Sequence, residues 1–330
     1  MSWKIGKLPA GPGNRITDVP GVRVGHATVD RGECHTGVTV ILPGPGNPFT
    51  RKYTAAGVTF NGYGKSLGLV QVEELGTLET PIALTNTLNV GKVHDALVSW
   101  MIRQCAADGI RLTSVNPVVG ECNDSRVSRI EERPVGEAEV FAALESADTD
   151  FRQGAVGAGR GTVCYGMKGG IGSASRLIRL GEETFTLGVL VQSNYGASGD
   201  FRRACLPEGL AECDQGSIMI ILATDLPLSC RQLKRVLRRA SVGMARLGSY
   251  IGHGSGEIAI GFTTAPREEA GSYFQTARFL QEEEMNLPFR AMGEAVEEAI
   301  LRSMLEAGPE TALDGRRIPS LREMLRDENE

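Results

Sequence analysis

The sequence predicts an α+β protein in which sheets and helices pack as a sandwich. Short apolar runs rich in branched residues, typical of buried strands, occur in both halves of the 330-residue chain. Helical segments lie among them, but strands and helices do not alternate as regularly as a doubly wound sheet requires. The 42 glycines are spread along the whole chain, which indicates tight turns and close backbone approaches. No internal repeat or boundary divides the sequence, so we expect a single domain over residues 1–330.

The expected strands are short runs that end at turn-forming residues. The first follows the Pro20-Gly21 turn, and the second ends at a loop over residues 43–48 that is rich in proline and glycine. The run from Ile218 to Thr224 is wholly apolar until its last residue and predicts a strand buried on both faces. In order, the expected strands cover residues 15–29, 36–42, 57–60, 67–72, 114–120, 185–192, 217–224 and 258–263.

Four longer segments predict helices, and a polar tail follows the last of them. These helices are expected over residues 91–107, 136–145, 229–247 and 287–307. The connection from Gly196 to Gln215 is long for a compact domain, and loops of that length without structure of their own are usually functional or disordered.

Composition excludes several functional classes. The net charge of −5 and the pI near 5.6 give no electrostatic footprint for nucleic acid, and the basic residues over 231–239 have the spacing of a solvated helix face. No stretch is long enough to span a membrane, and the N-terminus lacks the apolar core of a signal peptide. The seven cysteines form no CxxC pair, which predicts reduced thiols in a cytoplasmic protein.

The sequence gives no sign of a cofactor or a metal. Residues 157–161 lack the GxGxxG spacing, and residues 61–66 end in Lys-Ser without the first glycine of a phosphate loop. Only four histidines occur, and no HExxH or carboxylate cluster has metal-ligand spacing. His253, two residues before Ser255, is most simply a turn residue. We therefore expect no nucleotide, no metal and no other cofactor.

The Gly216-Ser217 pair is the strongest candidate for catalysis. Ser217 would be the first residue of the buried strand, with its backbone held by the sheet and its hydroxyl facing a cleft. At the peptide before Ser217, Gly216 allows backbone conformations that are sterically closed to other residues. If that peptide bond breaks, Ser217 gains an α-amine beside its own hydroxyl, which is a nucleophile–base pairing. Taken alone, the pair is more often an ordinary turn.

Three further residues could complete such a site. Ser255 and Glu257 lie two apart at the start of a strand, so their side chains share a face. If that strand neighbours the one led by Ser217, a hydroxyl and a carboxylate would converge on the nucleophile. Asn194, at the end of its strand, could donate an amide hydrogen bond to a developing oxyanion. The simpler interpretation of Ser255 and Glu257 is a glycine turn capped by a surface acid. The simpler interpretation of Asn194 is a turn-forming residue.

Seven segments, in this order, resemble the DmpA/BapA family of serine aminopeptidases, which comprises L-aminopeptidase/D-esterases and β-peptidyl aminopeptidases. No single segment is decisive, but all seven occur in register over most of the chain. They cover residues 16–26, 81–87, 117–121, 164–172, 188–194, 216–217 and 253–257.

The resemblance implies a precursor that cleaves itself before the nucleophilic serine and folds as a four-layer αββα sandwich, like N-terminal nucleophile hydrolases but differently connected. By position, the α chain would be residues 1–216 and the β chain residues 217–330. Several roles carry over in the same way. Ser217 matches the nucleophile, Ser255 and Glu257 its hydrogen-bonding partners, Asn194 the oxyanion amide, Tyr165 a tyrosine lining the site, and Glu121 the acid that receives the substrate's amino group.

The resemblance therefore predicts a self-processing aminopeptidase that acts on short peptides, amides or esters through an acyl-enzyme. Family members form oligomers of the αβ unit, so a homo-oligomer, a tetramer or larger, is expected. The segment from Glu121 to Ser125 is shorter than its family counterpart, which leaves the shape of the specificity pocket open.

Two rival interpretations remain. Ornithine acetyltransferases share this fold and also cleave themselves, but they have a threonine-led pattern, and Ser217 argues against them. The chain could also be an uncleaved homologue that serves as a binding or assembly protein.

Overall fold

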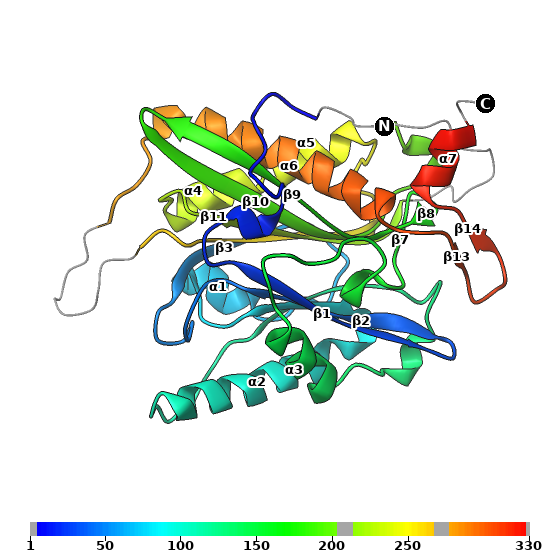
Figure 1. Ribbon diagram of the computed structural model, residues 1–330, viewed down its shortest axis with the longest axis horizontal. Helices are drawn as coiled ribbons and strands as arrows, with labels where there is room; N and C mark the ends of the chain where they lie inside the picture. Colours follow the sequence, from blue (N-terminus) through cyan, green and yellow to red (C-terminus); the bar gives the residue numbers. More distant parts are fainter. Residues whose placement is uncertain (1–4, 203–213, 267–276, 328–330) are drawn as a thin grey trace.

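Two β-sheets lie face to face, and each is covered on its outer side by helices (Figure 1). The structure is a computed structural model that describes residues 5–202, 214–266 and 277–327. The order of the layers is thus helix, sheet, sheet, helix, which is the αββα sandwich that the resemblance implied.

The larger sheet has six strands in the order β4-β3-β12-β11-β10-β9. β11 and β12 run parallel, and the other neighbours in this sheet are antiparallel. Its strands are β3 (Tyr53–Gly62), β4 (Thr77–Leu78), β9 (Gly170–Leu180), β10 (Glu183–Asn194), β11 (Gln215–Thr224) and β12 (Gly254–Thr263).

The smaller sheet has four strands in the order β1-β2-β5-β6, and only β5 and β6 are parallel. Two short hairpins complete the β structure. The strands of the smaller sheet are β1 (Arg23–Arg31), β2 (Cys34–Leu42), β5 (Ile82–Asn86) and β6 (Val118–Cys122), and the hairpins pair β7 (Val163–Cys164) with β8 (Met167–Lys168) and β13 (Glu310–Thr311) with β14 (Arg317–Ile318).

Helices α2 and α3 cover the smaller sheet, and α4, α5 and α6 cover the larger one (Figure 1). The α-helices are α1 (Leu69–Leu75), α2 (Val90–Ala107), α3 (Glu137–Glu145), α4 (Cys230–Leu237), α5 (Ala240–Arg246), α6 (Asn286–Leu305) and α7 (Leu321–Asp327). The 3-10 helices are η1 (Ile16–Asp18), η2 (Thr87–Asn89), η3 (Ile130–Glu132), η4 (Gly157–Gly159), η5 (Ser198–Asp200) and η6 (Glu282–Met285).

Strand β11 separates two hydrophobic cores, which explains its apolar sequence. Ile218, Ile220 and Leu222 pack with the core beneath α4–α6, whereas Met219 and Ile221 pack between the two sheets. Side chains of a strand alternate between its faces, so both faces of β11 must be apolar. The same alternation on β12 directs Ile258 and Ile260 between the sheets and Ala259 towards the helices.

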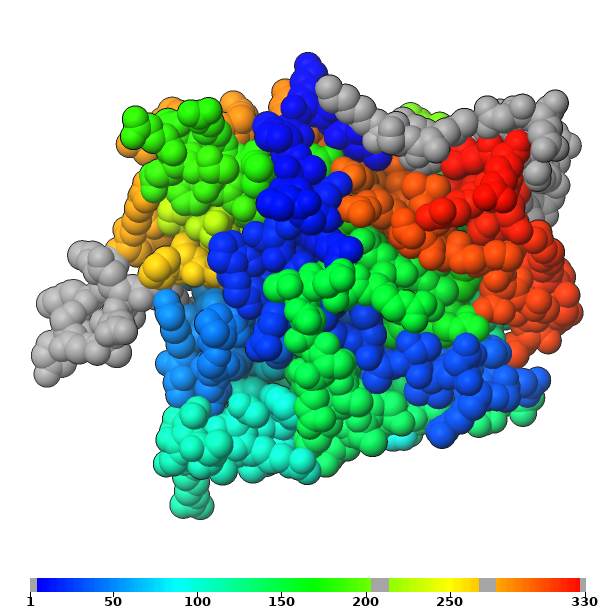
Figure 2. All heavy atoms as spheres, viewed as in Figure 1, coloured from blue at the N-terminus to red at the C-terminus, as the bar shows by residue number. Residues whose placement is uncertain are grey.

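The segment that precedes β1, drawn in dark blue, runs down the front of the molecule (Figure 2). The backbone N–H of Gly11 donates to Ser175 Oγ at 3.0 Å, and that of Ile16 donates to Ser173 Oγ at 2.7 Å. Ile16 itself is buried between the sheets. These contacts attach the segment to β9.

Several expectations from the sequence need correction. Residues 67–72, expected as a strand, belong mainly to helix α1, because Leu69 and Val72 are spaced by three and pack inward while Val70 is 86% exposed. The helix expected over residues 229–247 is two helices, separated at Arg238 and Arg239. Strand β9 was not expected, and the polar tail holds the β13–β14 hairpin and α7.

The remaining expectations concern membranes and thiols. In the described residues no helix is long and apolar enough to cross a membrane. The five cysteines within the described ranges are free thiols, and Cys205 and Cys213 lie outside those ranges. Most of the long connection between Gly196 and Gln215 also lies outside them.

Candidate active site

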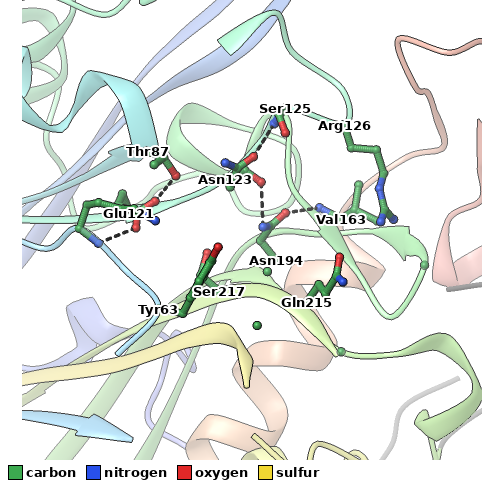
Figure 3. A pocket seen from close by; sticks show the side chains of 15 residues that line it. Tyr63, Thr87, Glu121, Asn123, Ser125, Arg126, Val163, Asn194, Gln215 and Ser217 are labelled. Atoms are coloured by element: carbon green, nitrogen blue, oxygen red, sulfur yellow. Dashed lines mark hydrogen bonds between the residues drawn. The ribbon is translucent and has the colours of Figure 1, made fainter. Parts of the chain in front are cut away.

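A polar cleft opens where β11 begins, and it has a volume of about 420 Å³. Both sheets and the loops between them contribute to its walls (Figure 3). The residues of interest that line it are Tyr63, Lys65, Thr87, Glu121, Asn123, Arg126, Asn194, Gln215, Gly216 and Ser217.

Gly216 and Ser217 lie in the wall of this cleft. Gly216 has φ +131°, and a Cβ built on it would lie 1.9 Å from the carbonyl oxygen of Asn194, so only glycine fits here. Ser217 is 3% exposed, and its Oγ has no hydrogen-bond partner within the described residues. Cys122 donates from Sγ to the carbonyl oxygen of Ser217 at 3.4 Å. The structure thus describes a serine hydroxyl that is uncommitted and next to a cleft.

Asn194 lies directly opposite Ser217 in the β10–β11 ladder. Residues paired in this way project their side chains from the same face of the sheet, so both side chains face the smaller sheet. Asn194 Nδ2 donates to the carbonyl oxygen of Asn123 at 2.8 Å, and Asn194 Oδ1 accepts from the backbone N–H of Val163 at 2.9 Å. These two bonds fix the amide and leave its second N–H available, because an amide nitrogen carries two donors.

Glu121 reaches the cleft from β6, in the smaller sheet. Its Oε1 accepts from the backbone N–H of Lys65 at 2.9 Å, and its Oε2 accepts from the Thr87 hydroxyl (Figure 3). The side chain is 3% exposed. Because an ionised carboxylate has about four lone-pair sites, the two bonds leave acceptor capacity for a cationic group in the cleft.

Ser255 and Glu257 lie on β12, next to β11, but on the other face of the sheet. The register pairs Ser217 with Gly256, so the residues on either side of Gly256 point away from the Ser217 side chain, towards the helical layer. The structure therefore brings the two strands together, as the sequence analysis supposed, without bringing these three side chains to one face. Ser255 lies beside Gly216 in the ladder and so close to the backbone nitrogen of Ser217.

The side-chain oxygens of Ser255 and Glu257 are buried. Both residues are 0% exposed, and neither Ser255 Oγ nor either carboxylate oxygen of Glu257 makes a hydrogen bond of good geometry within the described residues. Burial raises the pKa of Glu257 to about 7, an effect that the nearby Ser255 hydroxyl partly offsets and the charge of Asp214 increases. A buried polar group without a partner costs about 1–3 kcal/mol.

Tyr165 does not line the cleft. It is 0% exposed, its ring packs against Tyr195 and Phe201, and its hydroxyl donates to the Tyr195 hydroxyl at 3.3 Å. Burial raises its pKa well above the usual value. Its place in the hydrophobic core behind the cleft differs from the position that the resemblance implied.

Several cleft residues were not identified from the sequence. Residues 61–66, considered above only as a phosphate loop, form one wall, where Lys65 Nζ lies 4.9 Å from the centre of the Tyr63 ring. The backbone of Tyr63 approaches so closely that a Cβ on Gly256 would lie 2.4 Å from its carbonyl oxygen. The glycine pattern could have indicated this close approach. No sequence signal pointed to Thr87 or Arg126.

Metal binding has no support in the geometry of the described residues. None of their His, Cys, Asp and Glu side chains gather in groups of three or more that could hold a metal ion.

Comparison with known proteins identifies the family. The model of a family described as peptidase family S58 matches residues 14–318. This chain belongs to peptidase family S58. Among curated S58 relatives, it is 34% identical over 338 residues to the β-peptidyl aminopeptidase BapA of Sphingosinicella xenopeptidilytica, which covers 92% of this chain and 84% of the relative. The chemistry of its family is therefore peptide hydrolysis.

Solved structures agree with this assignment. The PH0078 protein from Pyrococcus horikoshii OT3 superposes with a TM-score of 0.91 at 40% identity, over 99% of this chain and 97% of that one. The L-aminopeptidase D-Ala-esterase/amidase from Ochrobactrum anthropi superposes with a TM-score of 0.86 at 33% identity, over 98% and 96%. The latter is described as a prototype for the serine aminopeptidases with a new variant of the Ntn hydrolase fold. The resemblance found in the sequence and the fold that it implied are both confirmed.

Proposed function

We propose that this chain is a serine aminopeptidase that cleaves itself between Gly216 and Ser217 and then uses Ser217 as its nucleophile. The observation that carries the proposal is the Ser217 hydroxyl. Among the described residues it has no hydrogen-bond partner, and it lies at the wall of a cleft whose other polar groups include the Asn194 amide and the Glu121 carboxylate. Scission would divide the chain into residues 1–216 and 217–330.

The proposed reaction proceeds in two steps. The Ser217 oxygen attacks the carbonyl carbon of the substrate's first residue, and its proton passes to the new α-amine of Ser217. The amine returns that proton to the leaving nitrogen as the peptide bond breaks, which leaves an ester on Ser217. Water then hydrolyses the ester by the same proton transfers in reverse order. An α-amine has an unperturbed pKa of about 7.7–8.0, which suits this exchange near neutral pH.

The Asn194 amide would stabilise the oxyanion that forms in both steps. Its second N–H is uncommitted, and its side chain is on the Ser217 face of the sheet. Because the Asn123 carbonyl and the Val163 N–H already orient the amide, little reorganisation is needed when charge develops. An oxyanion donor of this kind contributes about 10²–10³-fold to kcat.

The Ser255–Glu257 pair would receive the new amine. The amine of Ser217, and the ammonium that it becomes on taking the hydroxyl proton, would supply the hydrogen-bond donors that the three buried oxygens lack before scission. Rotation about the Cα–C bond of a free chain end could turn that amine towards the β12 side chains. In this proposal Glu257 orients Ser255 and the amine, as the third member of a triad does.

Glu121 would bind the free amino group of the substrate. Its carboxylate is anchored on two sides by the Lys65 N–H and the Thr87 hydroxyl, so its remaining acceptor sites have a fixed direction. An ammonium held there would make a free N-terminus a requirement for hydrolysis. The substrates would be short peptides, or amides and esters of amino acids.

The relatives support an aminopeptidase and not an acetyltransferase. Those named for an activity are β-peptidyl aminopeptidases and an L-aminopeptidase D-Ala-esterase/amidase, and the matched family is one of peptidases. Because these names cover different amino acids, the choice between α- and β-residues stays open. A single domain, a homo-oligomer of the αβ unit and a cytoplasmic location remain predictions from the sequence.

Release of amino acids from a panel of aminoacyl anilides tests the activity. Free-amine substrates should be hydrolysed, and their N-acetylated counterparts should be resistant because they cannot pair with Glu121. Glu121→Gln should lower kcat/KM for the free-amine substrates by about 10–100-fold, as expected for the loss of a charge-assisted contact of about 1.5–3 kcal/mol. Equal hydrolysis of both substrate classes would show that Glu121 does not bind the substrate's free amino group.

A further inference from the structure

The cleft contains a cation, Arg126, that forms no salt bridge with any of the residues that the structure describes. Arg126 lines the cleft and is exposed. Its guanidinium makes no hydrogen bond or salt bridge that involves the described residues, and only a weak attraction to Asp314 is present. Asp314 is already bonded to Arg316, with the Nε of Arg316 2.7 Å from its Oδ2. The five donors of the Arg126 guanidinium are therefore available to a ligand.

The loop that carries Arg126 is firmly held. The backbone N–H groups of Val127 and Ser128 donate to the carbonyl oxygen of Asp124 at 3.0 and 2.9 Å, and the N–H of Leu313 donates to the carbonyl oxygen of Arg126 at 3.0 Å. Val127 is fully buried. The backbone of Arg126 thus has a fixed position at the rim, although its side chain is exposed.

Charges of opposite sign lie at opposite ends of the cleft. Figure 3 shows Glu121 on one side of Asn194 and Arg126 on the other, with Ser217 near the middle. The second cation, Lys65, is at the Glu121 end, where its backbone N–H contacts that carboxylate and its ammonium lies over Tyr63. Glu121 and Arg126 therefore flank the proposed nucleophile on opposite sides.

We propose that Arg126 binds the free C-terminal carboxylate of a short peptide, so that peptides with a free carboxyl end are preferred over their amides. This inference rests on the proposed function, in which Glu121 holds the substrate's ammonium group. With the ammonium at Glu121 and the scissile carbonyl between Ser217 and Asn194, the leaving part of the substrate extends towards Arg126. A guanidinium can bind a carboxylate through two parallel hydrogen bonds, which an uncharged amide cannot match.

The size of the cleft sets the length of such a peptide. A volume of about 420 Å³ is in the lower part of the range found for small-ligand pockets, about 300–1,000 Å³. An extended chain spans at most about 3.3–3.6 Å per residue, so a long peptide would carry its carboxylate past the rim. We therefore assign dipeptides and tripeptides as the substrate class, with Arg126 as the residue that determines this specificity.

The test compares a free acid with its amide. L-Ala-L-Ala and β-Ala-L-Ala, each as the free acid and as the C-terminal amide, are incubated with the full chain, and kcat/KM is measured for release of the first residue. The free acid should be preferred by at least about 10-fold, since charge-assisted bonds to a carboxylate are worth about 1.5–3 kcal/mol. The preference should come mainly from a lower KM.

Variants of two arginines on one loop separate this role from general effects of charge. Arg126→Gln should bring the ratio of acid to amide close to one, and Arg126→Lys should restore part of the preference. Arg129→Gln is the matched control, because Arg129 carries the same charge three residues further on but pairs with Glu33 outside the cleft. It should keep the wild-type ratio.

The outcomes are distinct. Equal hydrolysis of acid and amide by the wild-type protein overturns the inference but leaves the aminopeptidase proposal intact. Retention of the preference in Arg126→Gln also overturns it. If neither the acids nor the amides are hydrolysed, the proposed function fails, and the inference fails with it.

Discussion

The two faces of the larger sheet differ in whether the polar side chains near Ser217 have hydrogen-bond partners. On the face towards the cleft, Asn194 and Glu121 each have their hydrogen bonds made and are anchored in place. On the face towards the helices, Ser255 and Glu257 are wholly buried, and their side-chain oxygens have no hydrogen bond of good geometry within the described residues. The side chains that would bind a substrate are thus held in place before scission, whereas the side-chain oxygens of Ser255 and Glu257 lack a donor among the described residues.

This difference indicates what scission would change. The cleft could accept a substrate as it stands, but no described side chain accepts a hydrogen bond from the Ser217 hydroxyl, so none of them is placed as its base. A free amine at Ser217 would provide that base, and it would also satisfy the buried oxygens on the opposite face. In this account a single cleavage activates the nucleophile and removes the cost of a buried, unpartnered pair.

Replacing the nucleophile should have the largest effect. Ser217→Ala should remain a single chain and lose at least about 10⁴-fold in kcat, because residues that act as a unit in serine hydrolases fail together. Gel electrophoresis under denaturing conditions and an anilide assay measure both properties. Ser146→Ala, at the end of α3 and far from the cleft, should be cleaved and active. A Ser217→Ala protein that still divides would show that another residue performs the scission.

Removing the oxyanion donor should have the next largest effect on the cleft face. Asn194→Ala should lower kcat by about 10²–10³-fold with a smaller change in KM, since the amide acts only when charge develops. Asn286→Ala is a suitable control, because Asn286 is exposed at the start of α6 and does not line the cleft. A purely structural role for Asn194 would change thermal stability and leave kcat of the folded protein nearly unaltered.

On the helical face, the unprocessed chain should be stabilised by neutralising Glu257. The pKa of this group is raised from 4.5 to about 7 by burial, so the folded chain keeps a proton that the unfolded chain releases near pH 4.5. Stability therefore falls as the pH rises from about 4.5 to about 7 and then levels off. Above pH 7, the ionised Glu257 lowers the free energy of unfolding by roughly 3 kcal/mol.

The measurement compares Ser217→Ala with the double variant Ser217→Ala/Glu257→Gln, so that neither is cleaved. Their free energies of unfolding should agree near pH 4.5, and the double variant should be the more stable at pH 8. Denaturant unfolding at both pH values gives the difference. Two parallel stability curves would mean that Glu257 already has a partner in the uncleaved chain.

The smallest effect is expected at Tyr165, in the core behind the cleft. Tyr165→Phe removes one hydroxyl and its bond to Tyr195, which should cost about 1 kcal/mol of stability or less. The catalytic rate should change by less than about 3-fold, because the residue does not line the cleft. A large loss of kcat at unchanged stability would return Tyr165 to the substrate site that the resemblance implied.

The sequence predicted those elements whose pattern has one simple structural meaning. The apolar runs over residues 218–224 and 258–263 became neighbouring strands, and the resemblance indicated the four layers. The run over residues 67–72 was misjudged because a short apolar segment fits a strand or a helix equally well until its packing partners are known.

The register of the strands, and the sheet face on which each side chain lies, explain why the sequence could not predict the remaining features of the site. Ser255, Glu257 and Ser217 could be placed on adjacent strands from the sequence, but only the pairing of Ser217 with Gly256 shows that they project from opposite faces. Lys65 and Arg126 reach the cleft from loops and Thr87 from the single turn of η2, and such positions carry no periodicity from which to infer them.

The most direct test of the central claim is the intact mass of the purified protein under denaturing conditions, followed by sequencing of any new N-terminus. The account predicts two species, residues 1–216 and 217–330, and a new chain that begins at Ser217. A single species of 35.3 kDa after prolonged incubation, in a preparation that is active as an aminopeptidase, would contradict it.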